Sequence, residues 1–303
     1  FQTFITNEIV THEAKTAEYQ QSNVKKIQTQ YELLKNLELS REDHFKLLDY
    51  CEDKKISFLS SAFDLASLNF LINDLNLELI KIPSGEITNL PYLRIIGDQV
   101  KPIVMSTGMS DYEEIEAAIS VLESCGASKT NITLLHCNTA YPTPMQDVNL
   151  SAMLSLQKKF DLSVGFSDHT IGIEAPIAAV AMGASVIEKH FTLDKHMEGP
   201  DHSASLEPNE LKNMVQAIRN ISTAMGDGIK KVSESEMQNI AAARKSIVAN
   251  KNLNANEILD DNNITTKRPG TGVSPMAWDS YIGKRLRNPV IKDQAINEDD
   301  IYI

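Results

Sequence analysis

Basic residues, cysteines and long apolar runs are all scarce in this sequence of 303 residues. It has 29 Lys and Arg against 41 Asp and Glu, which gives a formal net charge of −12. Because binding to a phosphate backbone needs a basic surface, this charge argues against a nucleic-acid-binding protein. No apolar stretch approaches the roughly 18–20 residues of a membrane span. The cysteines (Cys51, Cys125 and Cys137) are too widely spaced for a disulfide framework or a zinc knuckle, which favours a reducing, cytoplasmic location.

The glycine-rich motifs GxGxxG and GxxxxGK[ST] are also absent, so dinucleotide and P-loop sites lose their usual support. The sequence instead repeats a short apolar run followed by a helical pattern at intervals of roughly 25–30 residues, which predicts βα units and a parallel sheet. The predicted strands are residues 57–63, 79–85, 101–107, 132–137, 163–169 and 186–192, with residues 1–4 as the end of another. Two helices are marked by their ends, one from Asp111 to Gly126 and one from Pro208 to Gly226.

Each predicted strand ends in side chains suited to chemistry. These are Ser60-Ser61, Lys81 with Ser84 and Glu86, Ser106-Thr107, His136 with Asn138 and Thr139, Ser167-Asp168-His169, and Glu188-Lys189-His190. The carboxyl ends of parallel strands carry the site in TIM barrels and in open α/β sheets. Without a nucleotide motif, the barrel is favoured over the doubly wound sheet.

The pattern changes near residue 228. Residues 1–228 form the predicted barrel domain, residues 229–243 a polar and partly helical linker, and residues 244–303 a small β-rich domain with Gly and Pro concentrated in its turns. About 60 residues of this kind have a thin core, so we expect the small domain to be stabilised by contact with something else.

His169 and His190 close two successive predicted strands. Neighbouring strands lie ~4.8 Å apart, so two imidazoles there can share one ion, with oxygen ligands or water completing the shell. Such a mixed shell suits a divalent ion such as Mn²⁺. From the residues alone, two hydrogen-bonded core histidines are an equally good interpretation.

Lys81, Ser84, Ser106 and Ser167 offer one cation and several hydroxyls around a common opening, which is how a barrel holds a phosphate without a glycine-rich loop. The alternative is that these hydroxyls only cap the following helices. Glu86 and Asp201 are carboxylates able to orient hydroxyl groups or move protons. Taken singly, either is also typical of a surface acid.

Together these motifs resemble the sialic acid synthase family, which includes the N-acetylneuraminate, legionaminate and pseudaminate synthases. The resemblance covers essentially the whole chain and is carried by KIPSGEITNLP, STGM, HCNTAYPTP, GFSDHT, EKHFTLDK, GPDHSASLEP and KRPGTG, in this order. It implies a TIM barrel followed by a C-terminal antifreeze-like (SAF) domain. It also implies the metal-dependent condensation of phosphoenolpyruvate with an N-acetylmannosamine-type sugar to a nine-carbon 2-keto sugar acid and phosphate.

The resemblance also assigns roles to individual residues. His169 and His190 match the ligands of the metal, Mn²⁺ or Mg²⁺, and Glu86 matches an acid near the reacting carbons. Matches to the sugar-binding positions are Gln2, Tyr141, Asp201 and Arg268. Matches to the phosphoenolpyruvate-binding set are Ser61, Lys81, Ser84, Ser106, Thr139 and Ser167, with Ser61 in SSAF where the family has STPF and Thr139 the weaker transfer. Arg268 matches an arginine that one subunit delivers into the barrel of its partner, which implies a homodimer with swapped C-terminal domains.

The resemblance further implies how the reaction proceeds. C3 of phosphoenolpyruvate attacks the open-chain sugar aldehyde, an oxocarbenium-like centre develops at C2, water adds there, and phosphate leaves with C–O cleavage. Lys81 and Glu86 are the expected catalytic residues, with Glu86 moving the water proton. The KIPSGEITNLP and GPDHSASLEP variants favour N-acetylneuraminate synthesis, and legionaminate synthesis is the alternative.

Family members carry an upstream strand, helix and lysine that this chain does not show. Seven strands are visible where a (β/α)₈ barrel needs eight, so we expect a barrel lacking its first βα unit and a weakly active or inactive chain. A non-catalytic relic therefore remains an alternative. An ice-binding protein is disfavoured by the charged KRPGTG and KRLRNP turns.

Overall fold

The computed structural model describes residues 1–16 and 29–302 of the chain. It divides into two compact units, Phe1–Gly226 and Asp227–Ile303. Each unit has its own cluster of buried hydrophobic side chains, so each has the makings of a separate domain.

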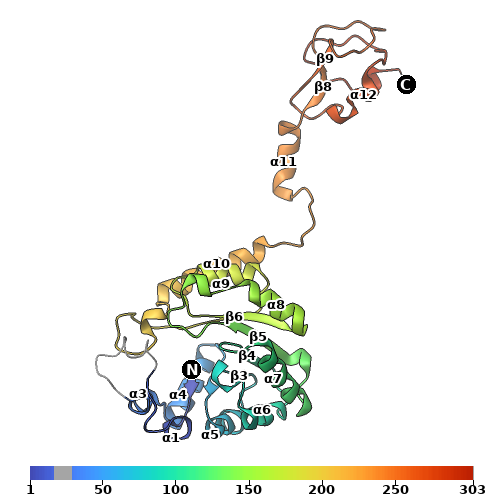
Figure 1. Cartoon of the computed structure of the whole chain (residues 1–303). Helices are drawn as coiled ribbons and strands as arrows, with labels where there is room; N and C mark the ends of the chain where they lie inside the picture. The colour runs from blue at the N-terminus through green and yellow to red at the C-terminus, as the bar shows by residue number, and fades with distance from the viewer. Residues whose placement is uncertain (17–28, 303) are drawn as a thin grey trace. The chain divides into compact units, whose positions relative to one another are not determined.

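One parallel sheet of seven strands organises the first unit, and its strands pair in chain order. The strands are β1 (Gln2–Thr3), β2 (Ser61–Ala62), β3 (Ile80–Ile82), β4 (Ile103–Ser106), β5 (Ile132–Cys137), β6 (Ser163–Asp168) and β7 (Ile187–Lys189). Each lies inside one of the seven predicted apolar runs, so the strand predictions are confirmed. The sheet curls, and the connecting helices lie along its outside (Figure 1). The predicted parallel α/β architecture of a TIM-type barrel is therefore correct.

Helices follow the strands of this unit. They are α1 (Thr6–Ile9), α3 (Gln30–Leu37), α4 (Arg41–Asp53), α5 (Leu65–Asn69), α6 (Leu90–Gly97), α7 (Tyr112–Ser124), α8 (Ser151–Phe160), α9 (Glu174–Ala181) and α10 (Pro208–Ala224). The two predicted helices are α7 and α10. Asp111 caps α7 by accepting hydrogen bonds from the N–H groups of Glu113 and Glu114, and Gly126 follows it with φ 117°.

The hydrophobic core of the first unit lies between the sheet and its helices. Side chains alternate across a strand, so Ile80 and Ile82 of β3 pack into this core and Lys81 between them faces the other way. Met105 and Leu134 of the next strands are fully buried in the same core. The alternation therefore leaves the polar strand-end residues on the inner side of the curl.

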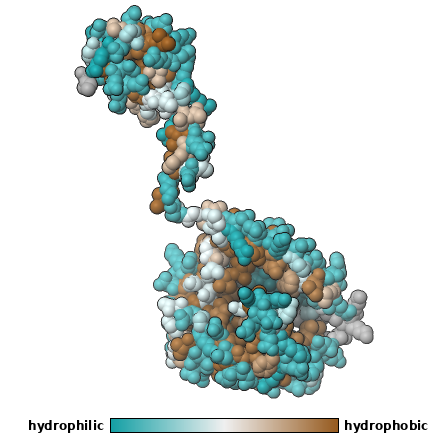
Figure 2. Space-filling view, turned by 180° about the vertical axis from the view of Figure 1, so that it is seen from behind, coloured by the Kyte–Doolittle hydropathy of each residue, from teal (hydrophilic) through white to brown (hydrophobic). Residues whose placement is uncertain are grey.

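Hydrophobic side chains also reach the surface of the first unit. Ile171, Phe191 and Leu193 are more than half exposed in the loops after β6 and β7. Figure 2 shows an area of hydrophobic surface on one face of this unit, bordered by hydrophilic residues. Within residues 1–16 and 29–302, no helix is long and apolar enough to cross a membrane.

The second unit is built from short strands and turns, as its sequence predicts. Helix α11 (Glu234–Ala243) occupies the stretch predicted as a linker. Strands β8 (Ser246–Ala249) and β9 (Ile264–Lys267) then pair antiparallel, and the short helix α12 (Trp278–Tyr281) follows. Isolated bridges extend the pairing, for example between Leu253 and Val290, around a core of ten buried hydrophobic residues.

Candidate active site

The strand-end residues meet at one edge of the curled sheet because its strands are parallel and in register. Register pairs Ser61 with Lys81 across β2 and β3, and Ser167 with Glu188 across β6 and β7. Lys81, Ser106 and Ser167 are all nearly fully buried. Buried polar groups need partners, so their contacts define the site.

Lys81 is the central cation of this edge. Its Nζ donates to Ser106 Oγ at 2.8 Å and to the carbonyl oxygen of Ile82 at 3.2 Å. Glu188 Oε2 lies 3.5 Å from the same nitrogen, and Glu188 Oε1 accepts from Ser167 Oγ at 2.7 Å. Residues from β3, β4, β6 and β7 are thus joined in one polar cluster, as the sequence predicts for Lys81, Ser106 and Ser167.

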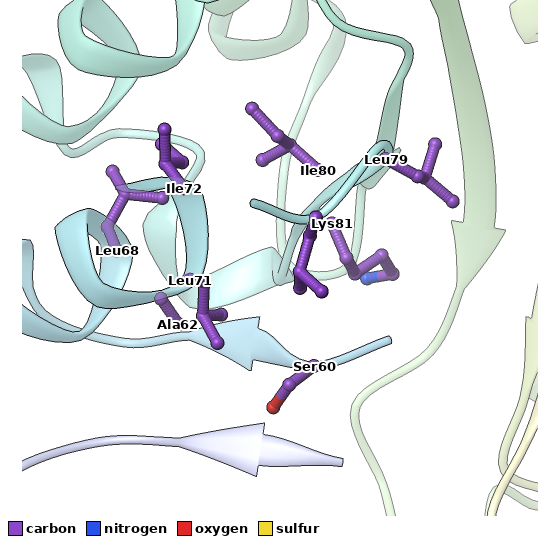
Figure 3. A pocket seen from close by; sticks show the side chains of 9 residues that line it. Ser60, Ala62, Leu68, Leu71, Ile72, Leu79, Ile80 and Lys81 are labelled. Atoms are coloured by element: carbon purple, nitrogen blue, oxygen red, sulfur yellow. The ribbon is translucent and has the colours of Figure 1, made fainter. Parts of the chain in front are cut away.

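The surroundings of Lys81 are apolar on one side. A small pocket beside the strand is lined by Ser60, Ala62, Leu68, Leu71, Ile72, Leu77, Leu79, Ile80 and Lys81 (Figure 3). The Lys81 ammonium lies on the side away from Leu68 and Ile72 (Figure 3). Burial lowers the pKa of Lys81 from its usual value, and the negative charge of Glu188 partly opposes this effect. A desolvated cation of this kind is a strong partner for an incoming anion.

Ser84 and Thr139 lie at the neighbouring position around Gly108. Ser84 Oγ accepts from the Gly108 N–H at 3.0 Å and lies 3.3 Å from Cys137 Sγ. A Cβ atom on Gly108 would lie 2.7 Å from Thr139 Cγ2 and 2.8 Å from Ser84 Oγ. A side chain at Gly108 would therefore have to displace Ser84 or Thr139, the two predicted residues that lie on either side of it.

His169 and His190 lie side by side at the ends of β6 and β7. Their ring centroids are 5.3 Å apart, and the Tyr141 ring lies 4.2 Å from His169 and 5.4 Å from His190. His169 Nδ1 donates to the Asn138 carbonyl oxygen, so Nε2 keeps its lone pair. Burial lowers the pKa of His169 to about 4, which keeps the ring neutral. A neutral, oriented imidazole is the form that binds a metal ion.

Asp201 lies beside His190, one of the two histidines. Its Oδ2 lies 3.7 Å from His190 Nδ1, whereas its buried Oδ1 has no hydrogen-bond partner among the described residues. Burial raises the pKa of the Asp201 carboxyl. Among residues 1–16 and 29–302, no group of three or more His, Cys, Asp or Glu side chains forms a complete set of metal ligands. Two imidazoles and a nearby unsatisfied carboxylate oxygen therefore fit a cation whose shell is completed by water or substrate oxygens.

Glu86, Ser61 and Gln2 lie along the other end of the sheet. Glu86 follows β3, its Oε2 accepts from Asn89 Nδ2 at 2.6 Å, and burial raises the pKa of its carboxyl. Ser61 lies in β2, partly exposed, and pairs with Gln2 of β1, which is exposed. Within residues 1–16 and 29–302, no contact joins these three residues to the histidine pair. Their predicted roles in catalysis and substrate binding therefore stay predictions.

Arg268 belongs to the second unit. It follows β9 on an exposed turn, and its Nε donates to the Ala243 carbonyl oxygen at 3.0 Å. Its predicted role in the barrel of a partner stays a prediction.

Glu188 belongs to the polar cluster around Lys81 but is not among the site residues predicted from the sequence. The EKH motif places it at a strand end, but the sequence does not say which neighbour it meets. Its two oxygens join Lys81 to Ser167, so it fixes both groups and sets the charge around the lysine. The strand alternation that puts Glu188 and His190 on one face is the signal that could have included it.

Comparison with known proteins follows the same two-unit division. Residues 1–230 match the model of the NeuB family, and residues 244–301 match the SAF domain. The chain is 50% identical to the N,N'-diacetyllegionaminic acid synthase of Campylobacter jejuni over 298 residues, covering 98% of this chain and 89% of that protein. It is 45% identical to the N,N'-diacetyllegionaminic acid synthase of Legionella pneumophila, covering 94% and 81% respectively.

Among solved structures, the chain resembles the N-acetylneuraminic acid synthetase of Leptospira borgpetersenii in complex with citrate. The TM-score is 0.66 at 32% identity, covering 79% of this chain and 78% of that one. The higher identities to proteins named for legionaminic acid favour the legionaminate alternative over the N-acetylneuraminate interpretation of the sequence. The chain belongs to the NeuB family and is an enzyme of the synthase type that its motifs predict, one that forms a carbon–carbon bond with phosphoenolpyruvate.

Proposed function

We propose that this enzyme condenses phosphoenolpyruvate with 2,4-diacetamido-2,4,6-trideoxymannose, giving N,N'-diacetyllegionaminate and phosphate. The proposal rests on a buried cation, Lys81, and a pair of histidines, His169 and His190, that lie at the same edge of the sheet. The choice of sugar is supported by the two relatives named N,N'-diacetyllegionaminic acid synthase.

The Lys81 cluster is suited to the phosphate and carboxylate of phosphoenolpyruvate. Lys81 supplies the positive charge, and Ser106 and Ser167 supply hydroxyl donors within the same cluster. Ser84 adds a hydroxyl beside Gly108, and Ser61 adds another across from Lys81. Thr139, whose methyl group faces Gly108, is proposed to contact the same substrate. Lys81 would make charge-assisted hydrogen bonds to this anion, which are stronger than hydrogen bonds between neutral groups.

His169 and His190 are the residues that would hold a divalent metal, Mn²⁺ or Mg²⁺. The bound ion would act as a Lewis acid beside the sugar aldehyde. His169 is held in the required tautomer by Asn138, and Tyr141 packs against both rings. Gln2, Tyr141 and Asp201 are the proposed contacts to the sugar.

The proposed reaction balances as phosphoenolpyruvate plus sugar plus water giving the keto acid plus phosphate. C3 of phosphoenolpyruvate bonds to the aldehyde carbon, water adds at C2, and the C2–O bond to phosphate breaks. Glu86 is proposed to move the proton of that water. Burial raises the pKa of its carboxyl toward neutral pH, and a general acid–base group is most effective when its pKa lies near the working pH. Holding both substrates together removes much of the entropic barrier.

Arg268 is proposed to reach the sugar in the barrel of a partner subunit. It lies on the exposed KRPGTG turn of the SAF domain, where its Nε donates a hydrogen bond to the carbonyl oxygen of Ala243. This arrangement requires a homodimer with exchanged C-terminal domains, which is a closed two-fold assembly. Such exchange would also give the small domain the stabilising contact that its size calls for.

The test is phosphate release from phosphoenolpyruvate with and without the diacetamido sugar. We expect release only when both substrates and a divalent metal are present, loss of release with a chelator, and recovery on adding Mn²⁺. His190→Ala should lose the metal-dependent activity, whereas His196→Ala, an exposed loop histidine, should keep it. Near-normal turnover and metal affinity in His190→Ala would contradict the metal assignment.

A further inference from the structure

An ion pair, Asp168–Lys189, is formed by the two residues that precede the histidines in the sequence. Lys189 Nζ lies 2.6 Å from Asp168 Oδ2, and their side chains are only 2% and 0% exposed. Asp168 and Lys189 are the last residues of β6 and β7 and face each other in register. Each therefore directly precedes one histidine of the pair, His169 or His190.

Alternation explains why this pair is separate from the substrate cluster. Ser167 and Glu188 face the inside of the curl, where they hydrogen-bond to each other and Glu188 reaches Lys81. The next pair, Asp168 and Lys189, points to the opposite side of the sheet. Neither side chain can therefore touch a substrate at the sheet edge, and any effect of the pair on the reaction must act through other residues.

The ion pair also ties the backbone that follows His169. Asp168 Oδ1 accepts from the Thr170 N–H at 2.9 Å, and Lys189 Nζ donates to the Thr170 carbonyl oxygen at 2.5 Å. The residue after His169 is thus bound through both its N–H and its C=O to the residues that precede the two histidines. His169 itself is bound through its carbonyl oxygen to the Thr143 N–H.

We propose that Asp168 and Lys189 are positioning residues that set the separation and orientation of His169 and His190 for a divalent cation. The inference rests on the metal site of the proposed function and deepens it. Groups that orient metal ligands from behind commonly change metal affinity 10–100-fold when they are removed. A buried ion pair adds little net stability by comparison, so fixing geometry is its best-supported use here.

The test measures Mn²⁺ affinity by calorimetry and phosphoenolpyruvate affinity separately. Lys189→Met alone leaves Asp168 as an unpaired buried charge and risks misfolding. The informative variant is therefore the double substitution Asp168→Asn with Lys189→Met, which removes both charges. Its matched control makes the same two changes at the exposed pair Asp227→Asn with Lys231→Met, whose charged atoms lie 2.7 Å apart.

We expect the buried double variant to bind Mn²⁺ about 10–100-fold more weakly while it keeps the parent circular dichroism and phosphoenolpyruvate affinity. The control pair should change neither affinity. Mn²⁺ affinity within twofold of the parent would overturn the inference, as would an equal loss of both affinities, which marks a general structural role. His190→Ala distinguishes failure of this inference from failure of the proposed metal site. Parent-like Mn²⁺ binding in that variant would refute the metal site itself.

Discussion

At the scale of single residues, the decisive feature is a lysine placed where water is scarce. Lys81 is 4% exposed and is surrounded by one carboxylate, one hydroxyl and one carbonyl oxygen. Desolvation disfavours the charged form of Lys81 and lowers its pKa, whereas the negative charge of Glu188 stabilises the ammonium and partly offsets that effect. An anion arriving at this site gains a cation that is only partly neutralised, so binding and protonation of Lys81 are linked.

This linkage predicts a pH dependence. Because the pKa of Lys81 lies below the usual 10.5, the ammonium loses its proton at a lower pH than an exposed lysine does. Phosphoenolpyruvate affinity should therefore fall on the alkaline side, beginning below pH 10.5, as measured by calorimetry across a pH series. Lys81→Arg should move this decline to higher pH, because a guanidinium stays protonated. An identical alkaline decline in both proteins would show that another group controls it.

At the scale of elements, the turn between β4 and α7 borders the proposed binding site of the substrate phosphate. Gly108 lies between Ser84 and Thr139 with no room for a side chain. Gly85, in the neighbouring turn after β3, would place a Cβ in open space. Substitution by alanine therefore adds the same methyl group at both glycines, but it causes a steric clash only at Gly108.

We predict that Gly108→Ala raises the KM for phosphoenolpyruvate by on the order of tenfold, which corresponds to about 1.4 kcal/mol. The added methyl group must displace Ser84 or Thr139 from its place beside the anion. Gly85→Ala is the control and should leave the KM nearly unchanged. Equal KM values for the two variants, determined from initial rates of phosphate release, would contradict the placement of Ser84 and Thr139.

The elements themselves were predictable, and their lateral contacts were not. Apolar runs ending in polar residues locate β1 to β7 because burial on both faces requires such runs. The histidine pair follows from the same logic, since each histidine directly follows one of two neighbouring strands. The bridge from Glu188 to Lys81 spans strands that are not neighbours, and it depends on the curl of the sheet. A pattern along the chain carries no information about that distance.

At the scale of the whole molecule, the two units carry complementary parts of the proposed site. The first unit holds Lys81 and the histidine pair, and the second holds Arg268 on an exposed turn. Because Arg268 is proposed to serve a partner subunit, each complete site needs two chains. Two inactive variants should therefore repair each other when they assemble together.

We predict this repair for Arg268→Ala co-expressed with His190→Ala. In the mixed dimer, the barrel with intact histidines receives an intact arginine from its partner, and the other site stays inactive. Random pairing then gives activity at about a quarter of all sites. Each variant expressed alone should be inactive in phosphate release. Co-expressed protein that forms mixed dimers and yet stays inactive would contradict the exchange of domains.

Competition between two sugars tests most directly which reaction the enzyme catalyses. Phosphoenolpyruvate, Mn²⁺ and equal amounts of N-acetylmannosamine and 2,4-diacetamido-2,4,6-trideoxymannose are incubated with the enzyme, and the two nine-carbon products are separated by mass. A pocket built for a particular polar substituent rejects a substrate that lacks it. We predict that N,N'-diacetyllegionaminate is the predominant product. Predominant N-acetylneuraminate would contradict it.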